Sequence, residues 1–587
     1  MNEQERWETI LNLGHQQAMS LGAEIEKLAR DQADKPAIIY NDRCLSYAEL
    51  NSLANRYASF FYTQGYIKGD VVALFMENRP EYLAAITGLS KLGVIVALLD
   101  IGIRGQVLAR EVNLCEARAV IVSHELLGNF ESVITRLRLK SPAVIYVNNV
   151  PEDIKLSGNM QPLDPLLQLS SPENPATTPS ITSEDYLAYA FTAGQSGLRK
   201  GVAIRQQRWL KNGHLFSLFG HMNESTVQYM CLPLHFNSGV MGSYAGMVIS
   251  GSTMVLRQNF SVHTFWDDIR SCGANYMIMV GEIGRYLYNQ AEKPNDYDNP
   301  LEVMLSYGIW GDLIEPFRKR FGLKHLIEVY AKTEGVGSFI NYEEVLHMCG
   351  NLSLKGLRQG EVVQYDVHNN AIKFNDKGRA IKCQRGETGL LLCEINELNL
   401  FNGYLNDPEA TKKSILFNVL EDNDQYLHSG DLVKLHEKDY ISFVDRLGDT
   451  YRWKSKTVSA YAVADVLKKF YGAIEDVVVY AVKIPGFEGR CGMAAIKLLE
   501  DEKINWSGFI KYINQRMPEH ARPIFIRLVA SLEGDQDTEQ LREQLREEGY
   551  NPQTVEDQLF FLDTETDSYI PLDIDLYKQI LSQKISL

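Results

Sequence analysis

The sequence predicts an α/β protein, with a large N-terminal body of mainly parallel sheets and a small, mobile α+β domain at the C-terminus. Short β-branched runs alternate with amphipathic stretches, a glycine-rich loop follows one of these runs, and the pattern changes after about residue 445. With 587 residues, of which 45% are hydrophobic and 23% charged, the chain is long enough for more than one core.

The first part of the chain alternates strands and helices as βαβ units do. A helix opened by Pro80 follows the first strand, and another helix is expected over 105–114. Such units build a largely parallel sheet. The polar segment 151–183, rich in Pro, Ser, Asn and Thr, is predicted to be a connection. Strands are predicted over 71–76, 94–99, 119–122, 143–147, 230–233, 254–256 and 276–280.

The most informative stretch of the chain reads AFTAGQSGLRKG and should follow a strand. Gly194 and Gly197 let backbone N–H groups approach an anion, the hydroxyls of Thr192 and Ser196 are donors, and Lys200 adds a positive charge. The loop lacks the Gly-Lys-Ser/Thr ending of a Walker motif. A phosphate-binding loop and a solvated glycine-rich turn are both open interpretations of this stretch taken alone.

The C-terminal part has a different pattern. A polar, glycine-containing run over Asp445–Asp449 suits a hinge. We therefore predict a boundary here, with domains over 1–445 and 446–587. In the second domain we expect strands over 475–484, 491–498 and 524–530 and a helix near 505–516.

Composition excludes several classes of function. The formal net charge of −16 argues against binding a nucleic-acid backbone. The 8 cysteines form no C-x-x-C pair, so neither a zinc site nor a disulfide framework is indicated. The N-terminus is polar, and the most apolar window, 82–99, is too interrupted for a transmembrane segment. We expect a cytoplasmic protein with small-molecule or protein partners.

Several motifs, in order, resemble those of the AMP-forming acyl-CoA synthetases. Within that superfamily the chain is most similar to the fatty acid transport protein, or very-long-chain acyl-CoA synthetase, family. The resemblance runs from about residue 40 to the C-terminus. The matching stretches are LSYAELN over 45–51, ENRPE over 77–81, DRLGDTYRWK over 445–454, PGFEGR over 485–490, Arg522-Pro523 and YIPL over 569–572.

The resemblance implies a two-step reaction, in which a fatty acid or other acyl substrate forms acyl-AMP from ATP and is then transferred to CoA or another pantetheine thiol. It also implies that 1–445 is the nucleotide- and acyl-binding domain. In the phosphate loop, Thr192, Gly194, Ser196, Gly197 and Lys200 match the family's form. A carrier or partner protein and peripheral membrane contact are further options that this family leaves open.

A second motif, YAKTE over 330–334, matches the family's Y-G-x-T-E. By this resemblance Tyr330 stacks on adenine, Thr333 touches phosphate and Glu334 holds Mg²⁺, a cation suited to carboxylate oxygen. Asp431 and Arg446 match positions that contact the ribose. Lys200, Thr333 and Glu334 are thus the expected catalytic group. Taken singly, a core tyrosine, a solvated helix-capping glutamate and a turn aspartate are the more ordinary explanations of Tyr330, Glu334 and Asp431, and the order of the motifs reverses this preference.

The expected adenylation lysine is missing. The family places it about ten residues before an E-G-F-x-P element, here EGYNP over 548–552, and ungapped counting puts Glu539 there. The stretch 533–548 should form an acidic, solvated helix that would repel a triphosphate. Arg542 and Arg546 are the nearby cations that would have to substitute. Other departures from the family pattern are Gln195, Arg199, Trp310, Ala331, Ser455 and Lys456.

Two functions follow from these observations. The first is an active ATP-dependent fatty acyl ligase that uses a substitute cation. The second is a catalytically degenerate acyl- or nucleotide-binding or accessory protein, with an enzyme acting on an already activated acyl group as an intermediate case. His235, one place before the usual position of a family histidine, is expected to be structural or pocket-lining.

Overall fold

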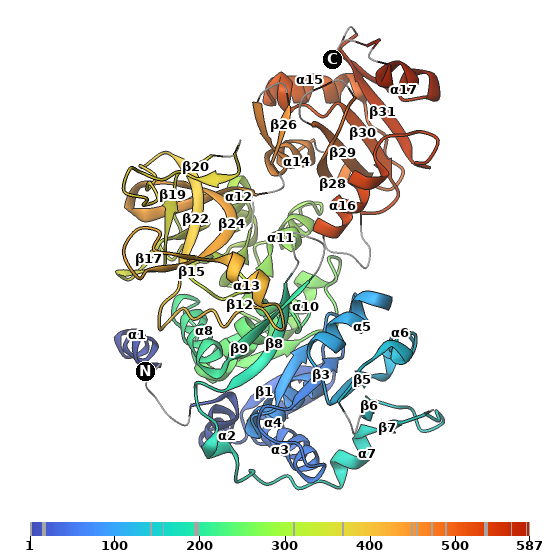
Figure 1. Ribbon diagram of the computed structural model, residues 1–587. Coiled ribbons are helices and arrows are strands. Elements are labelled where there is room, and N and C mark those ends of the chain that lie inside the picture. Colours follow the sequence, from blue (N-terminus) through green and yellow to red (C-terminus); the bar gives the residue numbers. More distant parts are fainter. Residues whose placement is uncertain are drawn as a thin grey trace.

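The computed structural model describes residues 3–13, 19–140, 144–156, 158–192, 199–308, 311–366, 369–447, 450–453, 456–470, 473–485, 487, 490–532, 538–564, 566–582 and 584–585. Mixed helices and sheets make up a large body, and a smaller C-terminal unit stands at the top of Figure 1. The predicted α/β class is therefore confirmed.

Two sheets form the centre of the body, and both are parallel except at their ends. The first has seven described strands, in the order β7 (Met160–Pro162), β6 (Val144–Asn148), β5 (Ala119–Ser123), β3 (Val71–Phe75), β4 (Ile95–Leu98), β8 (Tyr186–Thr192) and β9 (Lys200–Arg205). The second has eight described strands, in the order β15 (Ser338–Ile340), β14 (His325–Ala331), β13 (Val303–Tyr307), β12 (Tyr276–Val280), β10 (Val227–Met230), β11 (Thr253–Leu256), β1 (Pro36–Tyr40) and β2 (Arg43–Ser46). The antiparallel pairs are β8–β9, β1–β2 and β14–β15.

Most of the predicted strands of the body are confirmed, and one is misplaced. The strand expected over 230–233 ends at Met230, because the chain reaches Pro233, which has no N–H for a sheet ladder. The segment 151–183, predicted only as a connection, also contains β7 and the short helix α7 (Leu163–Gln168).

Buried helices join the two sheets into one core. The helix α3 (Tyr47–Thr63) begins with a capping box, in which Ser46 and Glu49 each bond the other's backbone N–H. In α4 (Pro80–Lys91) every residue except Glu81 is buried. Side chains of both helices pack in a cluster with Val72 of one sheet and Met254 of the other. The sheets are thereby held as one rigid base for the residues at their edges.

A third sheet, which the sequence analysis did not predict, follows β15. It is antiparallel, and its described strands run in the order β16 (Gly350–Asn351), β25 (Tyr440–Arg446), β24 (Gln425–Leu435), β22 (Thr388–Glu394) and β19 (Gly360–Val363), with β23 (Ile415–Phe417) on β24. In β24–β25, Asp431 is paired with Arg446. The sheet therefore brings two predicted ribose-contacting residues side by side.

The C-terminal unit has its own buried cluster, which includes residues from Tyr451 to Ile580. Its described sheet has the order β28 (Ile474–Val482), β29 (Cys491–Leu498), β30 (Phe525–Val529), β31 (Gln558–Asp563) and β32 (Ser568–Pro571). The predicted strands and the helix α15 (Trp506–Arg516) are confirmed. The boundary between 445 and 446 stays a prediction.

Apart from short 3-10 helices, the remaining described elements are helices around the sheets and three small hairpins. The helices are α1 (Glu3–Asn12), α2 (Leu21–Asp31), α5 (Gly105–Leu114), α6 (Leu127–Glu131), α8 (Gln206–Phe219), a π-helix (Asn237–Tyr244), α9 (Ala245–Ser250), α10 (Phe265–Cys272), α11 (Gly281–Tyr288), α12 (Gly311–Phe321), α13 (Pro408–Ser414), α14 (Ala460–Lys468), α16 (Thr538–Glu548) and α17 (Ile574–Leu581). The hairpins are β17 (Ser353–Leu354) with β18 (Leu357–Arg358), β20 (Tyr365–Asp366) with β21 (Ala371–Ile372), and β26 (Thr450–Trp453) with β27 (Lys456–Ser459).

Candidate functional site

Three cavities meet where β14 ends. Ala331, its last residue, lines all three, and Lys332 and Thr333 line two of them. Ligands of α/β sheets typically bind outside the carboxyl ends of the parallel strands. The YAKTE motif therefore lies where the fold itself favours a binding site.

The first cavity, which we call the nucleotide cleft, has a volume of about 810 Å³. It collects predicted site residues that are far apart in the sequence. Its lining includes Thr192, Lys200, Tyr330, Thr333, Glu334, Asp431 and Arg446. Sequence reasoning thus grouped seven residues that the structure also brings together.

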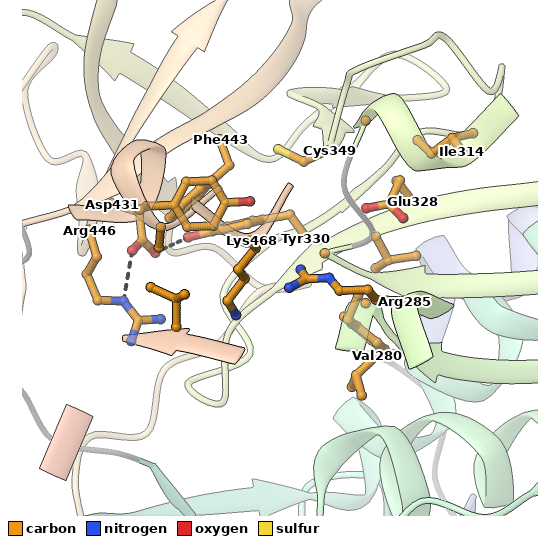
Figure 2. Close-up of a pocket in the computed structure, with 18 of the residues that line it drawn as sticks. Val280, Arg285, Ile314, Glu328, Tyr330, Cys349, Asp431, Phe443, Arg446 and Lys468 are labelled. Atoms are coloured by element: carbon orange, nitrogen blue, oxygen red, sulfur yellow. Dashed lines mark hydrogen bonds and ion pairs between the residues drawn. The ribbon is translucent and has the colours of Figure 1, made fainter. Parts of the chain in front are cut away.

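Asp431 is the most constrained acid of this cleft. Its carboxylate accepts a hydrogen bond from the Tyr330 hydroxyl and lies 3.1 Å from Lys332 Nζ and 3.3 Å from Arg446 Nε (Figure 2 shows the contacts of Tyr330 and Arg446). Burial alone would raise the pKa of Asp431, but the charges of Lys332 and Arg446 and the hydrogen bond from Tyr330 hold it below its ordinary value. The carboxylate is therefore ionised at neutral pH.

A second group in the cleft joins the phosphate-loop hairpin to the YAKTE motif. Lys200 lies opposite Thr192 in the β8–β9 pair, and its Nζ is 4.5 Å from the centre of the Tyr404 ring. The Tyr404 hydroxyl donates to Glu334 Oε1 at 2.7 Å. Sequence reasoning missed Tyr404, because it belongs to none of the motifs and reaches the cleft only through the fold.

The tip of the phosphate loop cannot be compared with the prediction. Gly194, Ser196 and Gly197 lie outside the described residues, as do Gln195, Trp310 and Ser455. The far end of the loop is described, and there Arg199 contacts Asp100 and Glu111 at 2.7 Å each. Two buried or half-buried carboxylates therefore anchor this end of the loop to the body.

The anchoring carboxylates differ in their protonation. Burial raises the pKa of Glu111 to about 7, although Arg199 opposes this shift. Burial also acts to raise the pKa of Asp100, but His235 and Arg199 hold it well below its ordinary value. His235 Nε2 lies 3.1 Å from Asp100 Oδ1, and His235 is buried. This contact is consistent with the structural, pocket-lining role expected of His235.

The second cavity, which we call the acyl cavity after the substrate that the sequence predicts, has a volume of about 540 Å³. The apolar part of its wall is formed by Leu98, Phe191, Phe216 and Val280. Charged side chains line its other parts. One of them is Arg208, which packs against Gly335 at the end of the YAKTE segment. An apolar wall with a few convergent polar groups is typical of a small-molecule site.

The third cavity lies between the body and the C-terminal unit and has a volume of about 670 Å³. Figure 2 shows Arg285 of α11 and Lys468 of α14 extending into it, with Asp431, Tyr330 and Arg446 at one side. Arg542 of α16 also lines it. Groups from the small domain therefore line the same cavity as three of the predicted nucleotide-binding residues.

The acidic segment near Glu539 is helical where it is described. Glu539 belongs to α16, but its side chain lies outside the described part of the chain. Arg542, one helical turn later, is half-buried. The structure thus places this part of α16 at the cavity without assigning a contact to Glu539.

A metal site made by the protein alone is absent from the described residues, because no group of three His, Cys, Asp or Glu is placed to hold an ion. Glu334 and Thr333 still offer oxygen atoms in the nucleotide cleft. Mg²⁺ is commonly bound by one or two carboxylates together with substrate phosphates. These residues therefore fit a Mg²⁺ ion that arrives with a nucleotide.

The fold and the site define an adenylate-forming enzyme. A sequence model of the AMP-binding enzymes matches residues 25–405. The chain is 34% identical over 567 residues to long-chain fatty acid transport protein 2 of Rattus norvegicus, covering 95% of this chain and 90% of that protein. It is 31% identical over 554 residues to the medium/long-chain-fatty-acid–CoA ligase FadD6 of Mycobacterium tuberculosis, covering 94% and 89%.

Comparison with solved structures shows the same fold. The crystal structure of the anthranilate CoA ligase AuaEII in complex with anthranoyl-AMP has a TM-score of 0.74 at 17% identity, covering 89% of this chain and 96% of that one. The chain belongs to the AMP-binding enzyme family, the AMP-forming acid–thiol ligases, and fatty acid transport proteins are among its relatives. The resemblance inferred from the motifs is confirmed. Across the described residues, none of the helices combines the length and apolar character needed to span a bilayer.

Proposed function

We propose that this protein is an ATP-dependent fatty acyl ligase, which forms acyl-AMP and then transfers the acyl group to CoA or another pantetheine thiol. The observation that supports this most is the wall shared by two cavities. Ala331, Lys332 and Thr333 line both the nucleotide cleft and the acyl cavity. A carboxylate in one cavity and a nucleotide phosphate in the other would therefore meet at this wall.

The proposed roles in the nucleotide cleft follow from the chemistry of its side chains. Asp431 offers carboxylate oxygens to ribose hydroxyls, and Tyr330 offers its ring to the adenine. Thr192 and Lys200 face the phosphates, and the loop residues Gly194, Ser196 and Gly197 would supply further donors. Reactions of this kind depend mainly on positioning and on neutralising phosphate charge. Bound at Glu334 and the phosphates, Mg²⁺ would contribute to that neutralisation.

The substrate is proposed to be a fatty acid. The apolar part of the acyl cavity, at Leu98, Phe216 and Val280, suits a hydrocarbon chain. The relatives with at least 30% identity include proteins named for long-chain and medium-chain fatty acids. This proposal is compatible with a carrier protein whose thiol accepts the acyl group. It is also compatible with peripheral contact with a membrane that supplies the fatty acid.

A direct assay tests the proposal. Purified protein is incubated with ATP, Mg²⁺, CoA and fatty acids of increasing chain length, and acyl-CoA and AMP are measured by mass spectrometry. We expect both products in equal amounts with at least one acid. Absence of both products, with every acid and with a phosphopantetheine carrier as alternative acceptor, would exclude ligase activity.

Glu539 favours a second candidate function, in which the protein starts from an activated acyl group. An acid in place of a lysine opposes adenylate formation but leaves the later transfer to a thiol unaffected. Synthetic acyl-AMP supplied with CoA but without ATP distinguishes the two. Transfer from acyl-AMP without any pyrophosphate release from ATP would support this second function over the first.

A further inference from the structure

We infer that Lys332 is the cation that bridges the acyl carboxylate and the α-phosphate during adenylation, in place of the small-domain lysine that this chain lacks. The inference rests on the proposed function and adds to it a catalytic residue on the body itself. None of the motif matches assigns a role to this position, which is the variable one in Y-G-x-T-E.

The location of Lys332 distinguishes it from every other described cation near the site. Arg199 and Arg208 line the acyl cavity but not the nucleotide cleft. Lys200 and Arg446 line the nucleotide cleft but not the acyl cavity. Among the described lysines and arginines, Lys332 alone lines both cavities, so it is the one described cationic residue at the wall that they share.

The contacts of Lys332 fix its ammonium group and leave it able to bind a ligand. Nζ donates to the backbone carbonyl of Ser429 at 2.5 Å and to Asp431 Oδ2 at 3.1 Å. The Lys332 side chain is 17% exposed and that of Asp431 only 2%. An ammonium group has three N–H donors, and these two contacts within the described chain use two of them. The third remains for an anion that binds beside this group.

The chemistry of the first half-reaction requires a positive charge at this wall. A carboxylate oxygen attacks the α-phosphorus of ATP, an O–P bond forms, and the bond from the α-phosphorus to the bridging oxygen breaks as pyrophosphate leaves. No proton is transferred, because both the attacking and the leaving groups are anions. Bringing two anions together is the main electrostatic cost of this step, and a fixed cation between them lowers it.

The acidic stretch of the small domain, where the family has its lysine, is a poor source of that charge. The stretch 533–548 contains seven acidic and two basic residues, and two of its described acids, Glu543 and Glu547, are exposed. Arg542 lines the third cavity, but neither the acyl cavity nor the nucleotide cleft. A lysine one residue before Thr333 thus compensates, on the body, for the acid at position 539.

The test separates the two half-reactions. Lys332→Met, Lys332→Arg, Arg542→Ala and the control Lys434→Met are compared with the wild type. Lys434 is exposed, belongs to β24 like Asp431, and lines none of the three cavities. Fatty-acid-dependent exchange of labelled pyrophosphate into ATP measures adenylation, and conversion of synthetic acyl-AMP and CoA to acyl-CoA measures transfer. ATP binding by calorimetry and the melting temperature report on folding.

We expect Lys332→Met to lower the exchange rate by about a hundredfold or more, the range observed when one preorganised donor to a transition state is removed. Transfer from acyl-AMP should change by less than about threefold, because that step no longer needs the cation. Lys332→Arg should retain part of the exchange, since the charge persists with a different geometry. Lys434→Met should match the wild type.

The outcomes distinguish this inference from the proposed function. Exchange by Lys332→Met at the wild-type rate, with loss in Arg542→Ala, would overturn the inference while the ligase activity stands. Equal losses of exchange, transfer and ATP binding in both Lys332→Met and Lys332→Arg would reduce Lys332 to a structural role and also overturn it. No exchange by the wild type with any acid would remove the proposed function, and the inference with it.

Discussion

The two sides of the nucleotide site differ in how their charges are arranged. On the body, Asp431 is held by Tyr330, Lys332 and Arg446, and each contact is between groups that line the cleft. On the small domain, Glu548 of α16 pairs away from the cleft, with Arg527 at 2.6 Å. This difference supports the inference that the body supplies the cation needed for adenylation.

The largest effect should come from Asp431→Asn. An amide of the same size cannot hold Lys332 and Arg446 by charge, and it accepts ribose hydroxyls more weakly. Hydrogen bonds that involve a charged group contribute about 1.5–3 kcal/mol, so we expect ATP affinity to fall by about a hundredfold. Titration calorimetry with ATP measures this change.

The matched control for this change is Asp422→Asn, because Asp422 is also paired with an arginine but its side chain is 85% exposed. The control should bind ATP as the wild type does. Undiminished binding by Asp431→Asn would mean that the cleft described here is not the nucleotide site.

A second prediction concerns the carboxylate that anchors the phosphate loop. Because burial raises the pKa of Glu111 to about 7 from 4.5, the native state binds more protons than the unfolded state between these values. Its contribution to stability is therefore fully present below pH 4.5 and is lost as the pH rises to about 7. One pKa unit corresponds to about 1.4 kcal/mol, so a shift from 4.5 to about 7 makes the loss on the order of 3 kcal/mol.

Denaturant unfolding at pH 5 and at pH 8 tests this assignment. The wild type should lose stability relative to Glu111→Gln as the pH rises, because the glutamine cannot titrate. The comparison between the two proteins cancels the other groups that titrate in this range. If stability changes with pH in the same way in both proteins, Glu111 is ionised throughout this range because of Arg199, and its pKa is not raised.

A smaller effect is expected from Tyr404→Phe, which removes one contact within the body and keeps the ring. The ring remains beneath Lys200, but Glu334 loses a hydrogen bond of 2.7 Å. We expect acyl-CoA formation to fall by about tenfold in kcat/KM. Tyr365→Phe is the control, since the Tyr365 hydroxyl bonds Asn370 at an exposed site. An unchanged rate would show that Glu334 is positioned without Tyr404.

The sequence predicted the parallel part of the fold because its signals are local. Runs such as 71–76 and 119–122 are continuously apolar, as strands buried on both faces must be. The antiparallel sheet over 350–446 escaped prediction because several of its strands have only two to four residues and pair across long distances in the chain. Short strands of this kind are determined by their partners more than by their own pattern.

The site residues that belong to a sequence motif could be predicted. Thr192, Lys200, Tyr330, Asp431 and Arg446 meet in one cleft, as the order of motifs indicated. Lys332, the residue most relevant to the missing lysine, was part of a motif but gave no signal. Its proposed role rests on the two cavities that it lines, and no local pattern encodes that.

The smallest effect is the one that tests the comparison most directly. If the body already supplies the cation, Glu539→Lys should change the pyrophosphate exchange rate of the wild type by less than about threefold. The same change in the Lys332→Met background should recover part of the lost exchange, because a lysine would again be available from the small domain. Such non-additivity is expected only if the two positions serve the same ligand.

Glu547→Lys, on an exposed position of the same helix, controls for the general effect of added positive charge. A large gain in exchange rate from Glu539→Lys in the wild type would instead show that the adenylation cation is missing from the small domain and is not supplied by the body.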